Sequence, residues 1–190
     1  MVLSFQPVRT QDEIAELAQI ASSIWNEYWP DIIGQEQTDY MVEMFQSEKA
    51  IANDIANNSY RYWVLRDEAG NVVGYTGGAT EKLTGDAEHD AHISHSPAVD
   101  AEFPERFFIS KIYLYASERG KHYSSEVLEF YAKLIVDEDL PAMYLTVNRD
   151  NVMGVRAYLG RGFYVIEDVD NPIGEGFVMT DHIMVKEARA

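Results

Sequence analysis

The sequence predicts an α/β fold, with strands and helices in the order βααβββαβαββ. Two features carry this prediction. Between residues 107 and 168 a strand, a loop, a helix, a strand, a helix and a strand follow one another, which is typical of a sheet covered by helices. In addition, no internal repeat and no linker interrupts the 190 residues, so we expect one domain over residues 1–190.

The first half of the chain supplies three strands and two helices. Thr10 and Glu13 form a capping-box signature at the start of the first helix, and Trp29-Pro30 ends it. In chain order we expect a strand at 3–9, a helix from about Asp12, a helix at 38–57, an antiparallel hairpin of strands 60–65 and 72–79, and a polar surface loop at 81–106.

The second half alternates more regularly. A strongly apolar strand comes first, and a helix beginning near Ser124 follows it with apolar residues at helical spacing. Gly162 stands where a glycine commonly follows the end of a helix. In chain order we expect a strand at 107–115, a helix over 125–136, a strand at 143–147, a helix at 151–159, and strands at 163–168 and 177–185.

Composition narrows the class of protein. Hydrophobic residues make up 46% of the chain, which is enough for a sizeable core, and no apolar run is long enough to span a bilayer. The absence of cysteine excludes disulfides, thiolate nucleophiles and cysteine-ligated metal sites. We therefore expect a soluble cytoplasmic protein.

The charge is strongly negative and unevenly distributed. The net charge is -17, and residues 1–100 carry five basic and seventeen acidic side chains. Such a field repels nucleic acid and anionic membranes and attracts cations, so we expect neither nucleic acid nor membrane as a partner. Solubility alone would also explain the excess of acid.

The basic loop 119–124 is the first sign of a binding site. It lies between the strand 107–115 and the next helix, so its backbone N–H groups would line a helix N-terminus, where phosphates bind. The loop lacks the glycine spacing of a dinucleotide fingerprint and the Gly-Lys-Ser/Thr of a P-loop. Its residues are Arg119, Gly120, Lys121, His122, Tyr123 and Ser124.

A second motif follows one strand and one helix later. The spacing resembles Leu-x-Val-Asn-x-x-Asn, six residues, then Tyr-x-x-x-Gly-Phe, and it is supplied by Leu145, Val147, Asn148, Asn151, Tyr158, Gly162 and Phe163. Together with the basic loop, this motif resembles the GNAT N-acetyltransferase superfamily, whose pyrophosphate loop reads Arg/Gln-x-x-Gly-x-Gly/Ala. The resemblance covers roughly residues 107–168.

The resemblance implies a GNAT-like α/β (α+β) fold, with a mixed central sheet of about seven strands flanked by about four helices. It also implies acetyl-CoA as co-substrate and no metal. The pyrophosphate would bind the backbone of residues 119–124, and the pantetheine arm would pair with the backbone of Tyr113, Leu114 and Tyr115. Asn148 and Asn151 would complete the cofactor site, and Tyr158 would protonate the departing thiolate as the catalytic acid.

Two residues of the loop depart from the family pattern. His122 stands where the family usually has Gly, and Ser124 stands where it has Gly or Ala. If the backbone needs a positive φ at residue 122, the histidine costs roughly 1 kcal/mol there.

The general base is less evident. Some family members place a Glu in the fourth strand, where this chain has Ser110 and Lys111. Glu81 is an alternative, although a glutamate that opens an acidic loop is more often solvated surface. His89, His92 and His95 recur every three residues, but the polar, proline-containing context favours a loop over a metal site.

The residues and the resemblance together indicate an N-acetyltransferase that acetylates a primary amine by direct attack in a ternary complex. The acidic first half favours a small cationic amine as the acceptor. Two alternatives remain: an acyl-CoA-binding module with impaired catalysis, and an acidic interaction protein that binds no CoA. Because dimers are common in the family that the chain resembles, a homodimer is the assembly that we consider.

Overall fold

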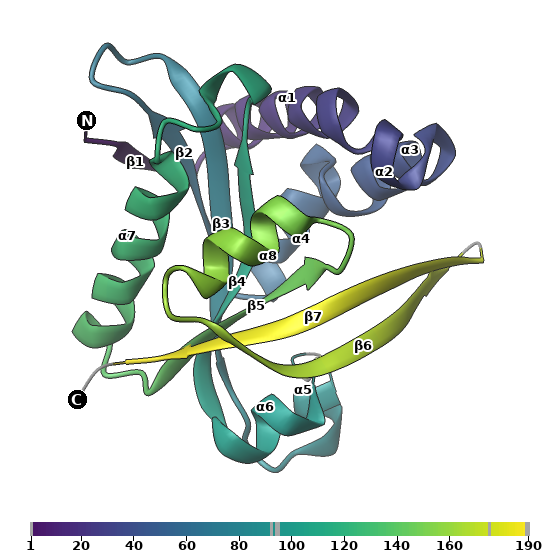
Figure 1. Cartoon of the computed structure of the whole chain (residues 1–190), viewed down its shortest axis with the longest axis vertical. Helices are drawn as coiled ribbons and strands as arrows, with labels where there is room; N and C mark the ends of the chain where they lie inside the picture. Colours follow the sequence, from purple (N-terminus) through teal and green to yellow (C-terminus); the bar gives the residue numbers. More distant parts are fainter. Residues whose placement is uncertain (1, 92, 94–95, 175, 189–190) are drawn as a thin grey trace. The chain divides into compact units, whose positions relative to one another are not determined.

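In the computed structural model, residues 2–91, 93, 96–174 and 176–188 are described (Figure 1). Seven strands form one mixed sheet in the order β1-β2-β3-β4-β5-β7-β6. Contacts divide the chain into two compact units, Met1–Ala79 with Ser110–Val127, and Thr80–Ile109 with Leu128–Ala190. The seven-stranded mixed sheet confirms the predicted fold class, whereas the single domain stays a prediction.

The first unit combines the N-terminal strands with four helices. Its elements, some of which continue into the second unit, are β1 Ser4–Pro7, α1 Gln11–Tyr28, α2 Pro30–Ile33, α3 Gln35–Phe45, α4 Glu48–Asn57, β2 Tyr60–Arg66, β3 Val72–Lys82, the end of β4 Glu105–Leu114, a 3-10 turn at Ala116–Glu118, and the start of α7 Tyr123–Asp137. β1 pairs with β2 and β2 with β3, both antiparallel.

The core of the first unit lies where α1 and α4 pack on β2 and β3. Leu17, Ala21, Ile51 and Tyr75 are completely buried in it. The predicted capping box is present in α1, because Thr10 accepts from the Glu13 amide and Glu13 reaches back to the Thr10 amide. Local sequence therefore fixes where this helix begins, and its apolar stripe fixes which face it buries.

The second unit contains the rest of the sheet. Its remaining elements are α5 Ala87–Ala91, α6 Pro97–Glu102, β5 Ala142–Asn148, α8 Val152–Leu159, β6 Tyr164–Gly174 and β7 Phe177–Glu187. β4 and β5 pair in parallel through Phe107–Ile109 and Met143–Leu145. β7 pairs antiparallel with both β5 and β6, and β6 and β7 form the long green and yellow hairpin of Figure 1.

Several expected helices differ in detail. The single helix expected at 38–57 is two helices, because the Ser47 side chain caps a new start by accepting from the Ala50 amide. The expected loop 81–106 contains α5 and α6, and Ser96 caps α6 in the same way. The short α2 was also not predicted. Within the described residues, no helix is long and apolar enough to cross a membrane.

Candidate active site

The basic loop after β4 has two residues in the left-handed backbone region. Gly120 has a φ of 76° and His122 a φ of 65°. A residue with a Cβ is uncommon there, although His tolerates the region better than bulky or β-branched residues. Residue 122 therefore has the positive φ at which we expected a histidine to be strained.

The loop leads directly into α7. The Ser125 amide donates to the His122 carbonyl at 2.9 Å, which closes the first turn of the helix. The first amides of a helix lack acceptors within the helix, so this N-terminus is a suitable donor surface for an anion. Glu126, an acidic residue in this first turn, accepts from the Leu3 amide of the N-terminal segment at 2.7 Å.

The two basic side chains of the loop already have protein partners. The Arg119 guanidinium lies over the Tyr28 ring, 4.0 Å from the ring centroid, and it donates to the Leu114 carbonyl at 3.4 Å. Lys121 is ion-paired with Glu118 at 3.0 Å. A phosphate would have to compete with Glu118 for Lys121, whereas Arg119 would remain stacked on Tyr28 and present its edge.

The end of β4 was expected to pair with pantetheine. The Tyr115 amide donates to the Val73 carbonyl at 3.1 Å, so the backbone of this residue is directed towards β3. Backbone groups alternate in direction along a strand, which directs the Leu114 backbone to the other side. Of the groups predicted here, the Leu114 amide is thus the best placed to pair with a ligand, because the Leu114 carbonyl accepts from Arg119 and the Tyr115 amide donates to β3.

β3 approaches this segment closely. A Cβ built on Gly74 would lie 2.1 Å from the Tyr113 carbonyl oxygen and 2.9 Å from the Leu114 Cα. The Tyr113 ring packs against Tyr75 with centroids 5.3 Å apart and against Trp25 at 5.4 Å. Backbone contact on one side and aromatic packing on the other therefore fix the last residues of β4.

In the second unit, the two predicted asparagines shape the turn from β5 to α8. Asn148 is 7% exposed, and its side chain accepts from the Asp150 amide at 2.9 Å. Asn151 is the N-cap of α8 and accepts from the Gly154 amide at 3.0 Å. Both residues consequently have a structural role, whatever they contribute to cofactor binding.

Tyr158 lies near the end of α8. Its ring is partly buried and lies 5.8 Å from the Phe163 ring, and its carbonyl accepts from the Phe163 amide. Burial raises the pKa of the Tyr158 hydroxyl to about 12. The phenol thus keeps its proton at neutral pH, as a general acid requires.

Glu81 lies in a buried network, which sequence reasoning did not anticipate. It is 3% exposed, and its Oε2 accepts from the Arg106 Nε at 2.9 Å and from the Tyr144 hydroxyl at 2.8 Å. Arg106 also contacts Asp100 of α6 at 2.7 Å. Burial raises the pKa of Glu81 to about 7, against the opposing effects of Tyr144 and Arg106. The expectation of a solvated Glu81 was wrong, and its partners assign it to holding α6 on the sheet.

Lys111 of β4 is also buried. Its Nζ lies 3.7 Å from Asp54 of α4 and 5.2 Å from the ring centroids of both Tyr60 and Tyr62. Burial lowers its pKa to about 8, although Asp54 favours the charged form. No local pattern marks this lysine, because its partners lie about fifty residues earlier in the chain.

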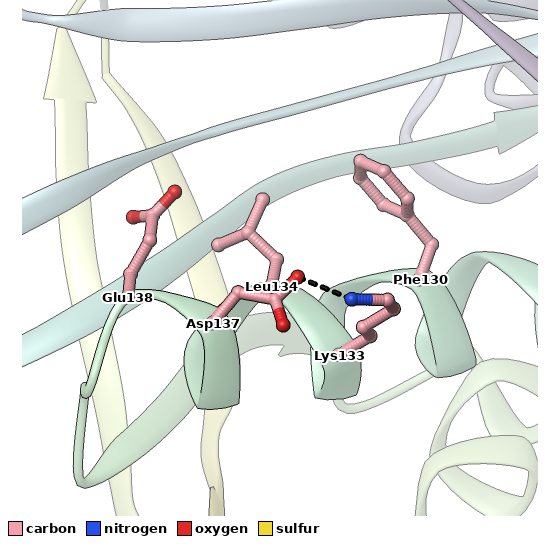
Figure 2. Close-up of a pocket in the computed structure, with 5 residues that line it drawn as sticks. All are labelled: Phe130, Lys133, Leu134, Asp137 and Glu138. Atoms are coloured by element: carbon pink, nitrogen blue, oxygen red, sulfur yellow. Dashed lines mark hydrogen bonds and ion pairs between the residues drawn. The ribbon is translucent and has the colours of Figure 1, made fainter.

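Two other features do not belong to the predicted site. Figure 2 shows an open depression on the second half of α7, lined by Phe130, Lys133, Leu134, Asp137 and Glu138, with Lys133 paired to Asp137. It contains none of the predicted cofactor or catalytic residues. Of the three histidines considered for a metal, His89 lies in α5, while His92 and His95 lie outside the described residues.

The predicted residues thus form two groups. The first unit holds the backbone of Tyr113, Leu114 and Tyr115 next to the loop of Arg119, Gly120, Lys121, His122, Tyr123 and Ser124. The second unit holds Asn148, Asn151 and Tyr158 on the turn from β5 and on α8. A mixed sheet with a basic loop between its fourth strand and the next helix is the arrangement that the resemblance to acetyltransferases implies.

The sequence agrees with this class. The pattern of the Acetyltransferase (GNAT) family matches residues 18–163, and the chain belongs to that family. Its members use acetyl-CoA. No curated protein sequence matches the chain.

Solved structures share the fold at low sequence identity. PaiA N-acetyltransferase from Thermoplasma acidophilum, in complex with coenzyme A, has a TM-score of 0.70 and 16% identity, covering 98% of this chain and 99% of its own. A GCN5-related N-acetyltransferase from Rhodopseudomonas palustris has a TM-score of 0.69 and 13% identity, covering 98% and 96%. Spermidine/spermine N-acetyltransferase SpeG from Vibrio cholerae has a TM-score of 0.57 and 16% identity, covering 98% and 93%.

Proposed function

We propose that this acetyltransferase transfers the acetyl group of acetyl-CoA to the primary amine of a small cationic acceptor, by direct attack in a ternary complex. The observation that carries the proposal is the loop 119–124, whose left-handed residues Gly120 and His122 lead into the N-terminus of α7. This combination offers backbone N–H groups to a pyrophosphate.

The residues available fit the rest of the cofactor. Leu114 would pair its amide with the pantetheine arm, since the Leu114 carbonyl accepts from Arg119 and the neighbouring Tyr115 amide donates to β3. Asn151 caps α8 and Tyr158 lies on this helix, and both residues belong to the second family motif. Bound acetyl-CoA would supply an activated thioester carbonyl.

Tyr158 is proposed as the acid that protonates the departing thiolate. Its raised pKa of about 12 keeps the hydroxyl protonated at the pH of the reaction. A backbone N–H of β4 would serve the carbonyl oxygen, which requires no side chain.

The acceptor class is proposed from charge. The net charge of -17 attracts cationic molecules, and the acidic excess is greatest in residues 1–100. The similar Vibrio cholerae protein is described as a spermidine/spermine N-acetyltransferase, although 16% identity supports only a likeness of fold. We therefore take spermidine as the first acceptor to test.

Replacing Tyr158 by Phe tests the proposed mechanism. We expect turnover with spermidine to fall about 100-fold or more, because a positioned general acid contributes roughly that much. Acetyl-CoA affinity, measured by calorimetry, should change by less than about twofold, because the Phe ring preserves the packing on Phe163. Tyr164→Phe is the matched control, since this tyrosine is exposed on β6.

The result also separates the alternatives. Acetyl-CoA binding without turnover on a panel of amines would favour an acyl-CoA-binding module. Absence of both heat and thermal shift with acetyl-CoA would favour an acidic interaction protein. An unchanged rate in Tyr158→Phe would exclude this residue as the acid.

A further inference from the structure

Asp181 is a buried carboxylate that the site described so far does not use. It lies in β7, directly opposite Asn148 at the end of β5 and opposite Val169 of β6. Residues directly opposite in antiparallel strands project from the same face of the sheet. The Asp181 side chain therefore lies on the same face as that of Asn148, at the strand end that leads to α8 and Tyr158.

This carboxylate lacks a hydrogen-bonding partner for one of its oxygens. Asp181 is 6% exposed, and its buried Oδ1 accepts no hydrogen bond from the described part of the chain. A buried, unsatisfied carboxylate oxygen is costly, and native proteins seldom keep one without a reason. Burial accordingly raises the pKa of Asp181 to about 6.

The two basic side chains that influence the pKa of Asp181 are held by other acids. Arg149, which follows Asn148, is ion-paired with Asp170 of β6. His182 contacts Asp168 of β6 through Nδ1 at 2.6 Å. Both basic groups lower the pKa of Asp181 from a distance, yet neither forms an ion pair with it, and Asn148 opposite is neutral. Asp181 is thus a buried acid whose neighbouring basic side chains, Arg149 and His182, contact other carboxylates.

We propose that Asp181 binds the ammonium group of the acceptor amine and accepts its proton before acetyl transfer. A primary ammonium has the charge and the donors that the unpartnered oxygen requires. Asp181 would also supply the base that residues 107–115 lack. This inference rests on the proposed function and assigns the acceptor end of that reaction.

Acetyl transfer begins with a proton transfer from the bound ammonium. An N–H bond of the ammonium breaks and an O–H bond forms on Asp181, which leaves a neutral amine. The amine nitrogen forms a bond to the thioester carbonyl carbon, and the C–S bond breaks as the tetrahedral intermediate collapses. The thiolate takes a proton from Tyr158, and the tyrosinate regains one from the nitrogen that becomes the amide. Asp181 then releases its proton to solvent, so each turnover yields one proton.

The test is Asp181→Asn, which keeps shape and removes the charge. With spermidine we expect kcat/KM to fall at least 100-fold and spermidine affinity by calorimetry to fall at least tenfold, while acetyl-CoA affinity stays within twofold. In the unsubstituted enzyme, the acid limb of kcat/KM should follow a group with a pKa near 6. In the variant this limb should disappear, and activity should recover partly at high pH, where the amine is neutral.

Stability distinguishes this role from a structural one. Asp181→Asn removes a buried charge without a close counterion, so the melting temperature should stay the same or rise while activity falls. A structural carboxylate would show the reverse. Asp137→Asn is the matched control, because Asp137 is an exposed acid of α7 in the same unit. In this variant kcat/KM with spermidine should change less than twofold.

The outcomes separate this inference from the proposed function. If the unsubstituted enzyme acetylates spermidine and Asp181→Asn keeps its rate and its acid limb, Asp181 is not the acceptor's base and only this inference falls. A fall in melting temperature together with lost activity would assign Asp181 to structure. If the unsubstituted enzyme binds acetyl-CoA but neither binds nor acetylates spermidine, the cationic acceptor and this inference fall together.

Discussion

His122 stands at a loop position that usually holds Gly in the family, and the backbone at this position makes the departure costly. Its φ of 65° is one that glycine adopts without cost, whereas a residue with a Cβ loses roughly 1–2 kcal/mol there. The strain lies in the loop proposed to bind pyrophosphate. Backbone strain of this kind persists only where the surrounding structure fixes the conformation.

Replacing His122 by Gly should relieve this strain. We expect the free energy of unfolding, measured in urea, to rise by about 0.5–1 kcal/mol, because the gain in the native state exceeds the entropy that Gly adds to the unfolded chain. Lys121→Gly is the control, since Lys121 is not among the described residues with positive φ. It should lower stability by about 0.5–1 kcal/mol. Stability changes of the same sign in both variants would contradict the assignment of strain to His122.

The candidate cofactor residues could be proposed from the sequence because their motif is local, and their part in cofactor binding stays a prediction. The environments of Glu81, Lys111 and Asp181 could not, since each depends on partners far away in the chain. Glu81 is buried by Arg106, which is 25 residues later. Asp181 faces Asn148 only because β7 pairs with β5. Whether a charged residue is exposed depends on the tertiary fold, so the residues next to it in the sequence do not determine it.

At the scale of elements, the turn from β5 to α8 depends on a pair of residues, Asn151 and Gly154. Asn151 caps α8 through the Gly154 amide, and a Cβ on Gly154 would lie 2.7 Å from the Asn151 Nδ2. A side chain at residue 154 would therefore displace the cap. The two residues act as a pair, in which the absence of one side chain makes room for the other.

Two substitutions separate capping by Asn151 from cofactor binding. Asn151→Ala should lower the free energy of unfolding by about 0.5–2 kcal/mol, while Asn151→Ser keeps a capping oxygen and should stay within about 0.5 kcal/mol of the unsubstituted protein. If the amide also contacts acetyl-CoA, the Ser variant should still lose about fivefold in affinity by calorimetry. Ser47→Ala, which removes the cap of α4, is the control and should lower stability alone. Unchanged affinity in Asn151→Ser would limit Asn151 to capping.

The strands were easier to predict than the helices. All seven expected strands are present, because apolar runs bounded by turn residues are clear signals. The expected helix 38–57 is interrupted at Ser47, where a side-chain cap favours a new start over continuation. The helices α5 and α6 are short and polar, so their apolar spacing is too weak to recognise, and Arg106 holds the second of them from outside.

At the scale of the whole molecule, charge is the main property available to select an acceptor. With a net charge of -17, long-range attraction should raise the local concentration of a polycation, and salt should screen this effect. The net charge can be counted from the sequence alone. The position of Asp181, proposed to bind the acceptor, could be known only from the pairing of β7 with β5.

Salt dependence tests the acceptor class. Between about 50 and 300 mM NaCl we expect kcat/KM for spermidine to fall several-fold, because screening shortens the range of the attraction to a few ångströms. For an amine that is uncharged at the assay pH, kcat/KM should change less than about twofold over the same range of salt. Equal salt effects on both amines would argue against electrostatic selection.

Gly74 has a consequence for how this protein can evolve. Any side chain at this position would push on the Tyr113 carbonyl and on Leu114, the segment proposed to pair with the cofactor arm. Alanine, the smallest change available, already adds the Cβ that lies too close. Position 74 should therefore tolerate no other residue in active descendants of this chain, and a library selected for acetyl transfer should return only glycine codons there.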